Sequence, residues 1–282
     1  MQDPSLETIV CCLGQPVAGN PTQFMMERAF EKAALDWRYL TLEVSPDDLS
    51  VAIKGLRAFG FKGGNLTIPH KVAVIEHLDG LSEAAGLMGA VNCVNRDGDQ
   101  MIGENTDGKG FIQSLRKVID PQGKQVVLFG AGGAARAIAV ELGMAKVAKI
   151  TIVNRSQERG QKLVDLLNDR VQVNADLVVL EGDLDLEGGT EIVINATSIG
   201  LGDETARVPL EMTSLTSEMV VADVIFNPPN TQLIRSAREL GCTTLDGLGM
   251  LVNQGVIAFK IWTGIEPDAQ IMREALEEYL EL

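Results

Sequence analysis

The sequence predicts an α/β protein of two domains, an N-terminal α/β domain followed by a Rossmann-type, doubly wound domain. Three observations lead to this fold class. The chain has 282 residues, which is about twice the length of a common single domain. Short apolar runs alternate with segments of helical periodicity, a rhythm typical of a sheet covered by helices. A glycine-rich turn at residues 130–133 follows one apolar run and precedes a helical segment.

The first domain is expected over residues 1–109 and is completed by about residues 248–282. Its strands are expected where short apolar or alternating runs occur, and its helices where apolar residues recur at intervals of three and four. Asp97-Gly98-Asp99 separates two strand-like runs and predicts a β-hairpin. The expected strands are 8–13, 37–44, 63–68, 90–96 and 100–104, and the expected helices are 20–36, 46–59, 71–78, 249–264 and 267–280.

The second domain is expected over residues 110–247, with the succession of strands and helices that forms a doubly wound parallel sheet. Its N-terminal boundary is soft because residues 110–118 could form a linking helix. The expected strands are 125–129, 149–153, 191–195, 219–224 and 242–245, and the expected helices are 134–144, 157–168 and 231–240.

Composition excludes several classes of protein. Acidic residues number 39 against 24 basic ones, a net charge of −15, which argues against a nucleic-acid or anionic-membrane partner. Two histidines and four cysteines without a CxxC pair argue against a metal centre or a disulfide scaffold. The start resembles no signal peptide, and no apolar run approaches the roughly 18 residues of a membrane span. The sequence therefore predicts a soluble, cytoplasmic protein without bound metal.

The glycine-rich turn predicts a dinucleotide site. Residues 125–129 form the apolar strand, and Gly130-Ala131-Gly132-Gly133-Ala134-Ala135 then fits the pattern GxGxxA before a helix. The first glycine permits a tight turn, the second lets the backbone approach a pyrophosphate, and the small third residue lets helix and strand pack closely. The helix N-terminus offers N–H groups to the phosphates. An ordinary βα turn is the alternative, but the strand and helix context favours the dinucleotide.

The tip of the next expected strand indicates which dinucleotide is bound. An enzyme that uses NAD usually has Asp or Glu there, bonded to the ribose 2′-hydroxyl. This chain has Asn154-Arg155-Ser156, followed by Arg159. Two guanidinium groups and a hydroxyl suit a 2′-phosphate. Solvated surface charges are the alternative, although cations are mildly unfavourable at a helix N-terminus. NADP is the predicted cofactor.

Polar side chains gather where strands of the first domain are expected to end. Asn65 and Thr67 are two residues apart on one strand, so they face the same side. Lys71 lies near the start of the following helix, where its charge opposes the helix dipole, and this position favours a functional role. Asn92 and residues 105–108 offer short polar side chains, although each alone is also turn chemistry.

Taken together, these segments resemble the shikimate dehydrogenase family over residues 14–264. The family reduces 3-dehydroshikimate to shikimate reversibly with NADPH, and the resemblance therefore implies an enzyme of aromatic amino acid biosynthesis. It also implies a small cyclic hydroxy acid as partner and a monomer or homodimer. The motifs that carry the resemblance are residues 65–71, 89–92, 105–108, 130–137, 154–156, 195–198 and 247–254.

The resemblance implies a role for individual residues. Lys71 and Asp107 match the catalytic pair, although a plain surface salt bridge is the alternative. Apart from the resemblance, the position of His70 between Pro69 and Lys71 predicts a residue that faces solvent. The implied substrate-binding residues are Asn20, Thr22, Asn65, Thr67, Asn92 and Gln254. The implied cofactor-binding residues are Gly130, Gly132, Gly133, Ala134, Asn154, Arg155, Ser156, Arg159, Thr197, Gly247 and Met250.

Two departures from the family pattern concern the carboxylate end of the substrate. Asn20 and Thr22 stand where the family usually has two serines, and Phe226 stands where it has a tyrosine. Losing a matched hydrogen bond at a polar site costs about 1–3 kcal/mol, which is enough to change substrate preference. Quinate, an aminated shikimate analogue or another cyclitol-like acid therefore stay open as substrates. A non-catalytic regulator that binds NADPH is a further alternative.

Overall fold

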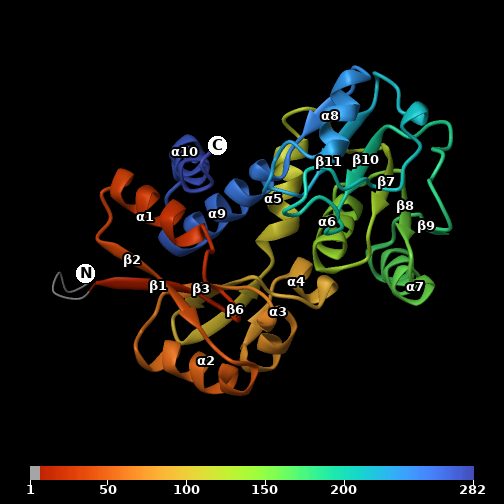
Figure 1. The fold of residues 1–282 in the computed structure, drawn as a ribbon. Coiled ribbons are helices and arrows are strands. Elements are labelled where there is room, and N and C mark those ends of the chain that lie inside the picture. The colour runs from red at the N-terminus through yellow and green to blue at the C-terminus, as the bar shows by residue number, and fades with distance from the viewer. Residues whose placement is uncertain (1–6) are drawn as a thin grey trace. The chain divides into compact units, whose positions relative to one another are not determined.

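The computed structural model describes residues 7–282, and the chain forms two compact units (Figure 1). Unit 1 runs to Thr106 and resumes at Gln254–Leu282, and unit 2 is Asp107–Asn253. Unit 2 is therefore inserted into the chain of unit 1.

Unit 1 contains a mixed sheet of six strands in the order β2-β1-β3-β5-β6-β4. β1 pairs in parallel with β2 and β3, whereas β3 and β5 are antiparallel. β5 and β6 form the hairpin that residues 97–99 predict. The strand bounds are β1 Thr8–Gly14, β2 Trp37–Glu43, β3 Gly63–Leu66, β4 Gly80–Leu81, β5 Cys93–Asp97 and β6 Gln100–Glu104.

Helices cover both faces of this sheet. In Figure 1, α1 and α10 lie on one face and α2 on the other. The core under α1 contains Phe30, whose ring stacks on that of Phe259 at 5.2 Å. Trp262 donates a hydrogen bond from Nε1 to the Val94 carbonyl at 2.9 Å, which ties α9 to β5. The helix bounds are α1 Thr22–Lys32, α2 Leu49–Ala58, α3 His70–Ala73, α4 Glu83–Met88, α9 Gly247–Thr263 and α10 Ala269–Tyr279.

Unit 2 contains a fully parallel sheet of six strands in the order β12-β11-β10-β7-β8-β9. Strand order reverses between β7 and β10, which is the signature of a doubly wound sheet and the usual place of its ligand. The Rossmann-type fold that the sequence predicts is therefore confirmed. The bounds are β7 Gln125–Phe129, β8 Lys149–Asn154, β9 Ala175–Val179, β10 Ile192–Asn195, β11 Val220–Asp223 and β12 Thr243–Leu245.

Two helices of unit 2 begin at side-chain caps. Ser156 and Thr231 accept hydrogen bonds from the third backbone N–H beyond them, Arg159 N and Ile234 N, at 3.3 and 3.4 Å. Such caps satisfy N–H groups that a helix start leaves open. The bounds are α5 Thr106–Leu115, α6 Gly133–Met144, α7 Gln157–Leu166 and α8 Gln232–Glu239.

The structure differs from the sequence prediction in four elements. The helix expected over 71–78 is two short pieces, α3 and a 3₁₀ turn at Val74–His77. Strand β9, strand β4 and helix α4 were not predicted. β9 lies in a run where Asn174 and Asp176 interrupt the apolar residues, and β4 is only two residues long. Both lack the periodicity on which a sequence prediction depends.

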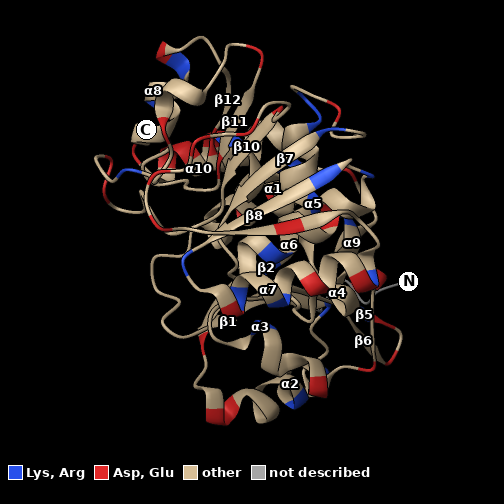
Figure 2. Cartoon of the chain, turned by 90° about the vertical axis from the view of Figure 1, so that its right-hand side faces the viewer, with Lys and Arg blue, Asp and Glu red and all other residues tan. Residues whose placement is uncertain are grey.

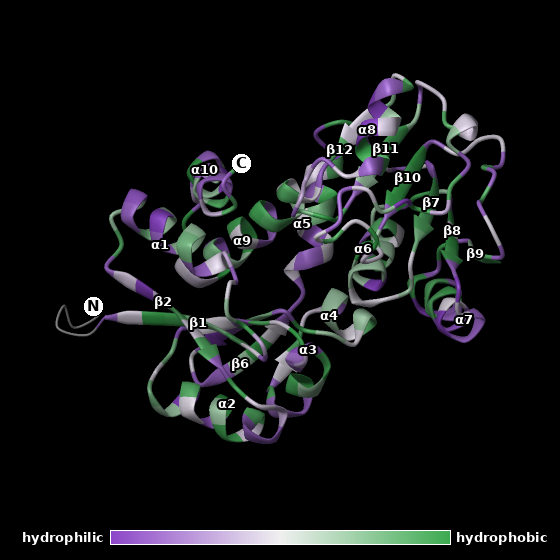
Figure 3. Cartoon of the chain, viewed as in Figure 1, coloured by the Kyte–Doolittle hydropathy of each residue, from purple (hydrophilic) through white to green (hydrophobic). Residues whose placement is uncertain are grey.

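Hydropathy and charge follow this architecture. Strands β7, β8, β10 and β11 are hydrophobic, whereas α7 and α8 carry hydrophilic stretches (Figure 3). Lys and Arg are interspersed with Asp and Glu over the view in Figure 2. Over residues 7–282, no helix combines the length and the apolar character that crossing a bilayer requires.

Candidate active site and dinucleotide pocket

The candidate substrate residues of unit 1 begin with Asn65, near the end of β3. Its side chain is held from two sides: Tyr39 Oη donates to Asn65 Oδ1 at 2.7 Å, and Asn65 Nδ2 donates to the Asn92 carbonyl at 3.1 Å. Burial raises the pKa of the Tyr39 hydroxyl well above its ordinary value, so this hydroxyl stays protonated and donates. The Asn65 amide is therefore fixed in one orientation.

Asn92 is locked in a reciprocal pair with the start of α5. Its Nδ2 donates to Thr106 Oγ1 at 3.0 Å, and its Oδ1 accepts from Thr106 N at 2.7 Å. Asn105 Nδ2 donates to the Ala90 carbonyl at 3.1 Å. All three side chains are buried. The segments 89–92 and 105–108, which the sequence singles out, are thus joined through buried amides and a hydroxyl.

Lys71, the second residue of α3, lies close to the same group of side chains. Burial raises the pKa of the Cys12 thiol to about 11, and a hydrogen bond with Tyr39 and the positive charge of Lys71 oppose that rise. Lys71 is half-buried. Its effect on Cys12 shows that its charge lies near the end of β1. The sequence did not identify Cys12 or Tyr39, because each looks like an ordinary core residue of a strand.

Asn20 reaches this group from the segment before α1. Its Nδ2 points to Cys12 Sγ at 3.8 Å, and its Oδ1 accepts from Thr22 N at 2.9 Å. Thr22 is buried as the first residue of α1. Gln254, on α9, is also buried within unit 1, and Thr67 directly follows β3. The amide oxygen of Asn20 is thus committed to the turn that starts the helix.

His70 corrects one expectation. The sequence predicts that it faces solvent, but it is 1% exposed, and its Nε2 lies 2.8 Å from the Val44 carbonyl. The first position of α3 turns the ring inward, where the carbonyl after β2 supplies its polar partner. A buried, hydrogen-bonded imidazole is a structural role that residue order alone does not reveal.

The glycine-rich turn of unit 2 follows β7. Gly130 has φ +112°, and a Cβ there would lie 2.9 Å from the Ala196 carbonyl oxygen, so the turn requires glycine. Gly132 is the N-cap of α6, and a Cβ at Gly132 or Gly133 would meet open space. Backbone N–H groups at the start of α6 are therefore accessible, as a pyrophosphate requires.

A pocket of about 760 Å³ opens beside this turn. Arg155 and Arg159 line it from the end of β8 and the start of α7, and Thr197 lines it from the segment after β10. An adjoining hollow of about 380 Å³ includes Ser156, whose Oγ caps α7. Of the eleven predicted cofactor residues, those that line these two hollows are Gly130, Gly132, Asn154, Arg155, Ser156, Arg159 and Thr197.

The other predicted cofactor residues lie outside that lining. Gly133 and Ala134 form the first turn of α6, and Gly247 and Met250 lie in the first turn of α9. A Cβ at Gly247 would lie 2.4 Å from the Val224 carbonyl oxygen, so close packing accounts for this glycine. Asp107 belongs to unit 2 and Lys71 to unit 1.

A buried polar network supports the segment that carries Thr197. Asp223, at the end of β11, accepts from Asn195 Nδ2 at 2.9 Å and from Thr231 Oγ1 at 2.7 Å. Asn195 Oδ1 in turn accepts from Thr197 Oγ1 at 2.7 Å. Burial raises the pKa of Asp223 to about 6, against the lowering effect of these hydrogen bonds. The network joins the ends of β10 and β11 to the start of α8.

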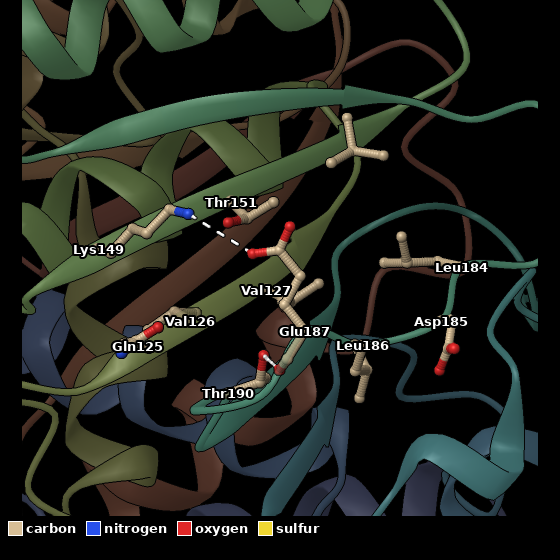
Figure 4. Close-up of a pocket in the computed structure, with 11 residues that line it drawn as sticks. Gln125, Val126, Val127, Lys149, Thr151, Leu184, Asp185, Leu186, Glu187 and Thr190 are labelled. Atoms are coloured by element: carbon tan, nitrogen blue, oxygen red, sulfur yellow. Dashed lines mark hydrogen bonds and ion pairs between the residues drawn. The ribbon is translucent and has the colours of Figure 1, made fainter.

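A third hollow, of about 230 Å³, lies at the opposite end of the strands (Figure 4). Gln125 and Lys149, the first residues of β7 and β8, line it together with residues 184–187. Lys149 pairs with Asp176 at 2.7 Å and with Glu187 at 4.0 Å. Its charge is thus compensated within unit 2, and the hollow is separate from the pocket at the glycine-rich turn.

Family models match most of the chain. The shikimate dehydrogenase substrate binding domain matches residues 12–94, shikimate / quinate 5-dehydrogenase matches residues 113–224, and the shikimate 5′-dehydrogenase C-terminal domain matches residues 247–277. A shikimate dehydrogenase (NADP(+)) from Methanopyrus kandleri is 38% identical over 278 residues, which cover 96% of each chain.

Solved structures agree in fold over nearly the whole length. The ligand-free 5-ketofructose reductase of Gluconobacter sp. strain CHM43 is 50% identical with a TM-score of 0.95, covering 97% of this chain and 99% of that one. A shikimate dehydrogenase in complex with NADP+ is 35% identical with a TM-score of 0.90, covering 99% and 98%. This chain belongs to the shikimate dehydrogenase family of NADP-dependent oxidoreductases.

Proposed function

We propose that this chain catalyses the reaction of its family, the reversible reduction of 3-dehydroshikimate to shikimate by NADPH. The observation that carries the proposal is the group of buried amides around Lys71 in unit 1. Amides and hydroxyls in fixed orientations suit a small substrate with several hydroxyl groups. A cytoplasmic monomer or homodimer is the proposed setting.

In this proposal Lys71 and Asp107 form the catalytic pair. Bound NADPH supplies the hydride for the carbonyl carbon, and NADP+ accepts it in the reverse direction. The Lys71 ammonium donates a proton to the carbonyl oxygen during reduction, and the amine takes a proton from the alcohol during oxidation. A carboxylate near a lysine favours the charged form, which gives Asp107 the role of keeping Lys71 ready to donate.

The other proposed roles follow from the chemistry of each side chain. Amide and hydroxyl groups can both donate to and accept from ring hydroxyls. The proposed ring-binding residues are Asn65, Thr67, Asn92 and Gln254, and Asn20 and Thr22 are proposed for the remaining end of the substrate. The proposed cofactor residues are Gly130, Gly132, Gly133 and Ala134 for the pyrophosphate, Asn154, Arg155, Ser156 and Arg159 for the ribose 2′-phosphate, and Thr197, Gly247 and Met250 near the nicotinamide.

A second candidate substrate is 5-ketofructose, a polyhydroxylated ketone without a carboxylate. Two observations favour it. The relative named 5-ketofructose reductase is 50% identical to this chain, against 35% for the shikimate dehydrogenase solved with NADP+. A carboxylate binds only to hydrogen-bond donors, and the Asn20 donor Nδ2 points to Cys12 Sγ at 3.8 Å, so Asn20 offers a carboxylate less than a serine hydroxyl does.

A substrate panel tests the proposal. NADPH oxidation is followed by absorbance with 3-dehydroshikimate, 3-dehydroquinate, a 3-dehydro-aminoshikimate and 5-ketofructose, and NADP+ reduction with shikimate and quinate. A higher kcat/KM for 3-dehydroshikimate supports the family reaction, and a higher one for 5-ketofructose supports the second candidate. The same panel with NADH measures the cofactor preference.

One outcome contradicts the proposed catalysis altogether. If the protein binds NADPH but turns over none of these compounds, the proposed catalysis is wrong. The protein would then be a non-catalytic regulator that binds NADPH. Binding is measured separately, by the fluorescence of NADPH titrated with protein, so that a silent assay can be assigned to chemistry or to the cofactor.

A further inference from the structure

Two charged residues that the sequence did not single out, Asp183 and Arg207, line the pocket at the glycine-rich turn. They form an ion pair through Asp183 Oδ2 and the Arg207 guanidinium. Asp183 lies four residues beyond the end of β9, and Arg207 lies in the segment between β10 and β11. The pair therefore joins two separate segments of the pocket wall.

Strand order tells which part of a dinucleotide these residues would meet. β7, β8 and β9 are neighbours in that order, and all three are parallel. Their carboxyl ends therefore share one edge of the sheet. The pyrophosphate belongs at the turn after β7, and the ribose 2′ position belongs after β8. Asp183, beyond β9, lies further along the same edge, on the adenosine side.

The backbone holds this wall in place. Leu184 N donates to the Pro209 carbonyl at 3.0 Å, and Glu211 N donates to the Leu184 carbonyl at 2.8 Å. The guanidinium has a second anchor, because Arg207 NH1 donates to the Leu210 carbonyl at 3.3 Å. These two hydrogen bonds orient the guanidinium, and about half of the Arg207 side chain stays exposed, so a planar ring can reach it.

The charges that line the pocket also suit the adenosine part of NADP. The charged residues that line the pocket are Arg155, Arg159, Arg207 and Asp183. An uncompensated carboxylate would repel the phosphates of NADP, and the ion pair removes this repulsion while positive charge stays in excess. A guanidinium also suits the face of a purine, since a cation is attracted to an aromatic ring.

We propose that Arg207 is an adenosine-binding residue, which stacks on the adenine ring of the cofactor, and that Asp183 is its positioning residue. This inference rests on the proposed use of NADP by the pocket. Neither residue belongs to the motif of glycines and arginines that predicts the dinucleotide. The contact is made to adenine, so it serves NADPH and NADH alike, whereas Arg155 and Arg159 serve the 2′-phosphate.

The test measures the dissociation constants of NADPH, NADH and 2′,5′-ADP for the full chain and for Arg207→Ala, Arg207→Lys and Asp183→Asn. Arg238→Ala is the matched control, because Arg238 is an exposed arginine of α8 in the same unit. We expect Arg207→Ala to raise the dissociation constants of all three ligands by a similar factor of about 3- to 30-fold. Arg207→Lys should recover only part of the loss, since it keeps the charge without the plane.

Three results would overturn the inference. The first is unchanged affinity in Arg207→Ala. The second is a loss confined to NADPH and 2′,5′-ADP, which would assign Arg207 to the 2′-phosphate. The third is wild-type affinity in the double variant Asp183→Asn/Arg207→Ala, which would mean that Arg207 only neutralises Asp183. In each case the wild-type protein still binds NADPH, whereas absence of that binding would contradict the proposed function itself.

Discussion

The candidate residues of the two units are held by different means. In unit 1 they are buried side chains that bond to one another, such as Tyr39, Asn65 and Asn92. In unit 2 the backbone shapes the pocket, through the Gly130 turn and the start of α6, and charged side chains line its wall. We infer that unit 1 selects its ligand by fixed hydrogen bonds, and that unit 2 selects by phosphate charge and by backbone shape.

Removing Lys71 should have the largest effect on function. The proposed proton donor, Lys71, lies in unit 1, so Lys71→Ala should lower kcat by about 10²- to 10⁴-fold, the usual value of acid–base help. The dissociation constant of NADPH should stay unchanged, because the cofactor pocket is formed by unit 2 residues. Steady-state kinetics and NADPH fluorescence measure the two quantities.

Lys54 provides the matched control for that substitution. It is an exposed lysine of α2 in the same unit, and Lys54→Ala should leave both kcat and the dissociation constant unchanged. A Lys71→Ala enzyme with a kcat within about threefold of wild type would refute the catalytic role.

The difference between the two units also explains which parts of the candidate site the sequence could predict. The glycine turn and the Arg155 motif are local, so the sequence reveals both, and the structure brings them to one pocket. The supports of Asn65 are not local: Tyr39 is 26 residues away and looks like any aromatic of a strand. Asp183 and Arg207 were missed for the same reason, since only the fold pairs residues 24 positions apart.

Unit 2 also contains a network of buried side chains, like those of unit 1. Asp223 lies at its centre and accepts hydrogen bonds from Asn195 and Thr231. Its pKa is about 6 in the folded state, against 3.8 ordinarily. Between those two values the folded state keeps a proton that the unfolded chain has lost, so its contribution to stability falls as pH rises from about 4 to 6. Asp223→Asn removes that contribution. The wild-type free energy of unfolding minus that of the variant should therefore fall by about 1–3 kcal/mol over this range.

Urea unfolding of both proteins at several pH values measures this difference. Asp203→Asn is an informative control, because hydrogen bonds from Thr205 lower the pKa of Asp203. A lowered carboxyl pKa adds stability as pH rises, so the corresponding difference should have the opposite sign. A pH-independent difference for Asp223→Asn would show that the buried carboxyl does not titrate in this range.

The smallest expected effect concerns the support of Asn65. Tyr39→Phe removes the hydroxyl that donates to Asn65 Oδ1 but keeps the buried ring, so the amide loses one of its two anchors. One such hydrogen bond is worth about 0.5–1.5 kcal/mol, which predicts a rise in substrate KM of about 2- to 13-fold. kcat and NADPH affinity should change little, because Lys71 and unit 2 are untouched. Tyr279→Phe, at the half-exposed end of α10, should change none of these quantities. A different result would contradict the inference that each unit selects its own ligand. If Tyr39→Phe weakened NADPH binding and left the substrate KM unchanged, a hydrogen bond within unit 1 would be acting on the ligand of unit 2.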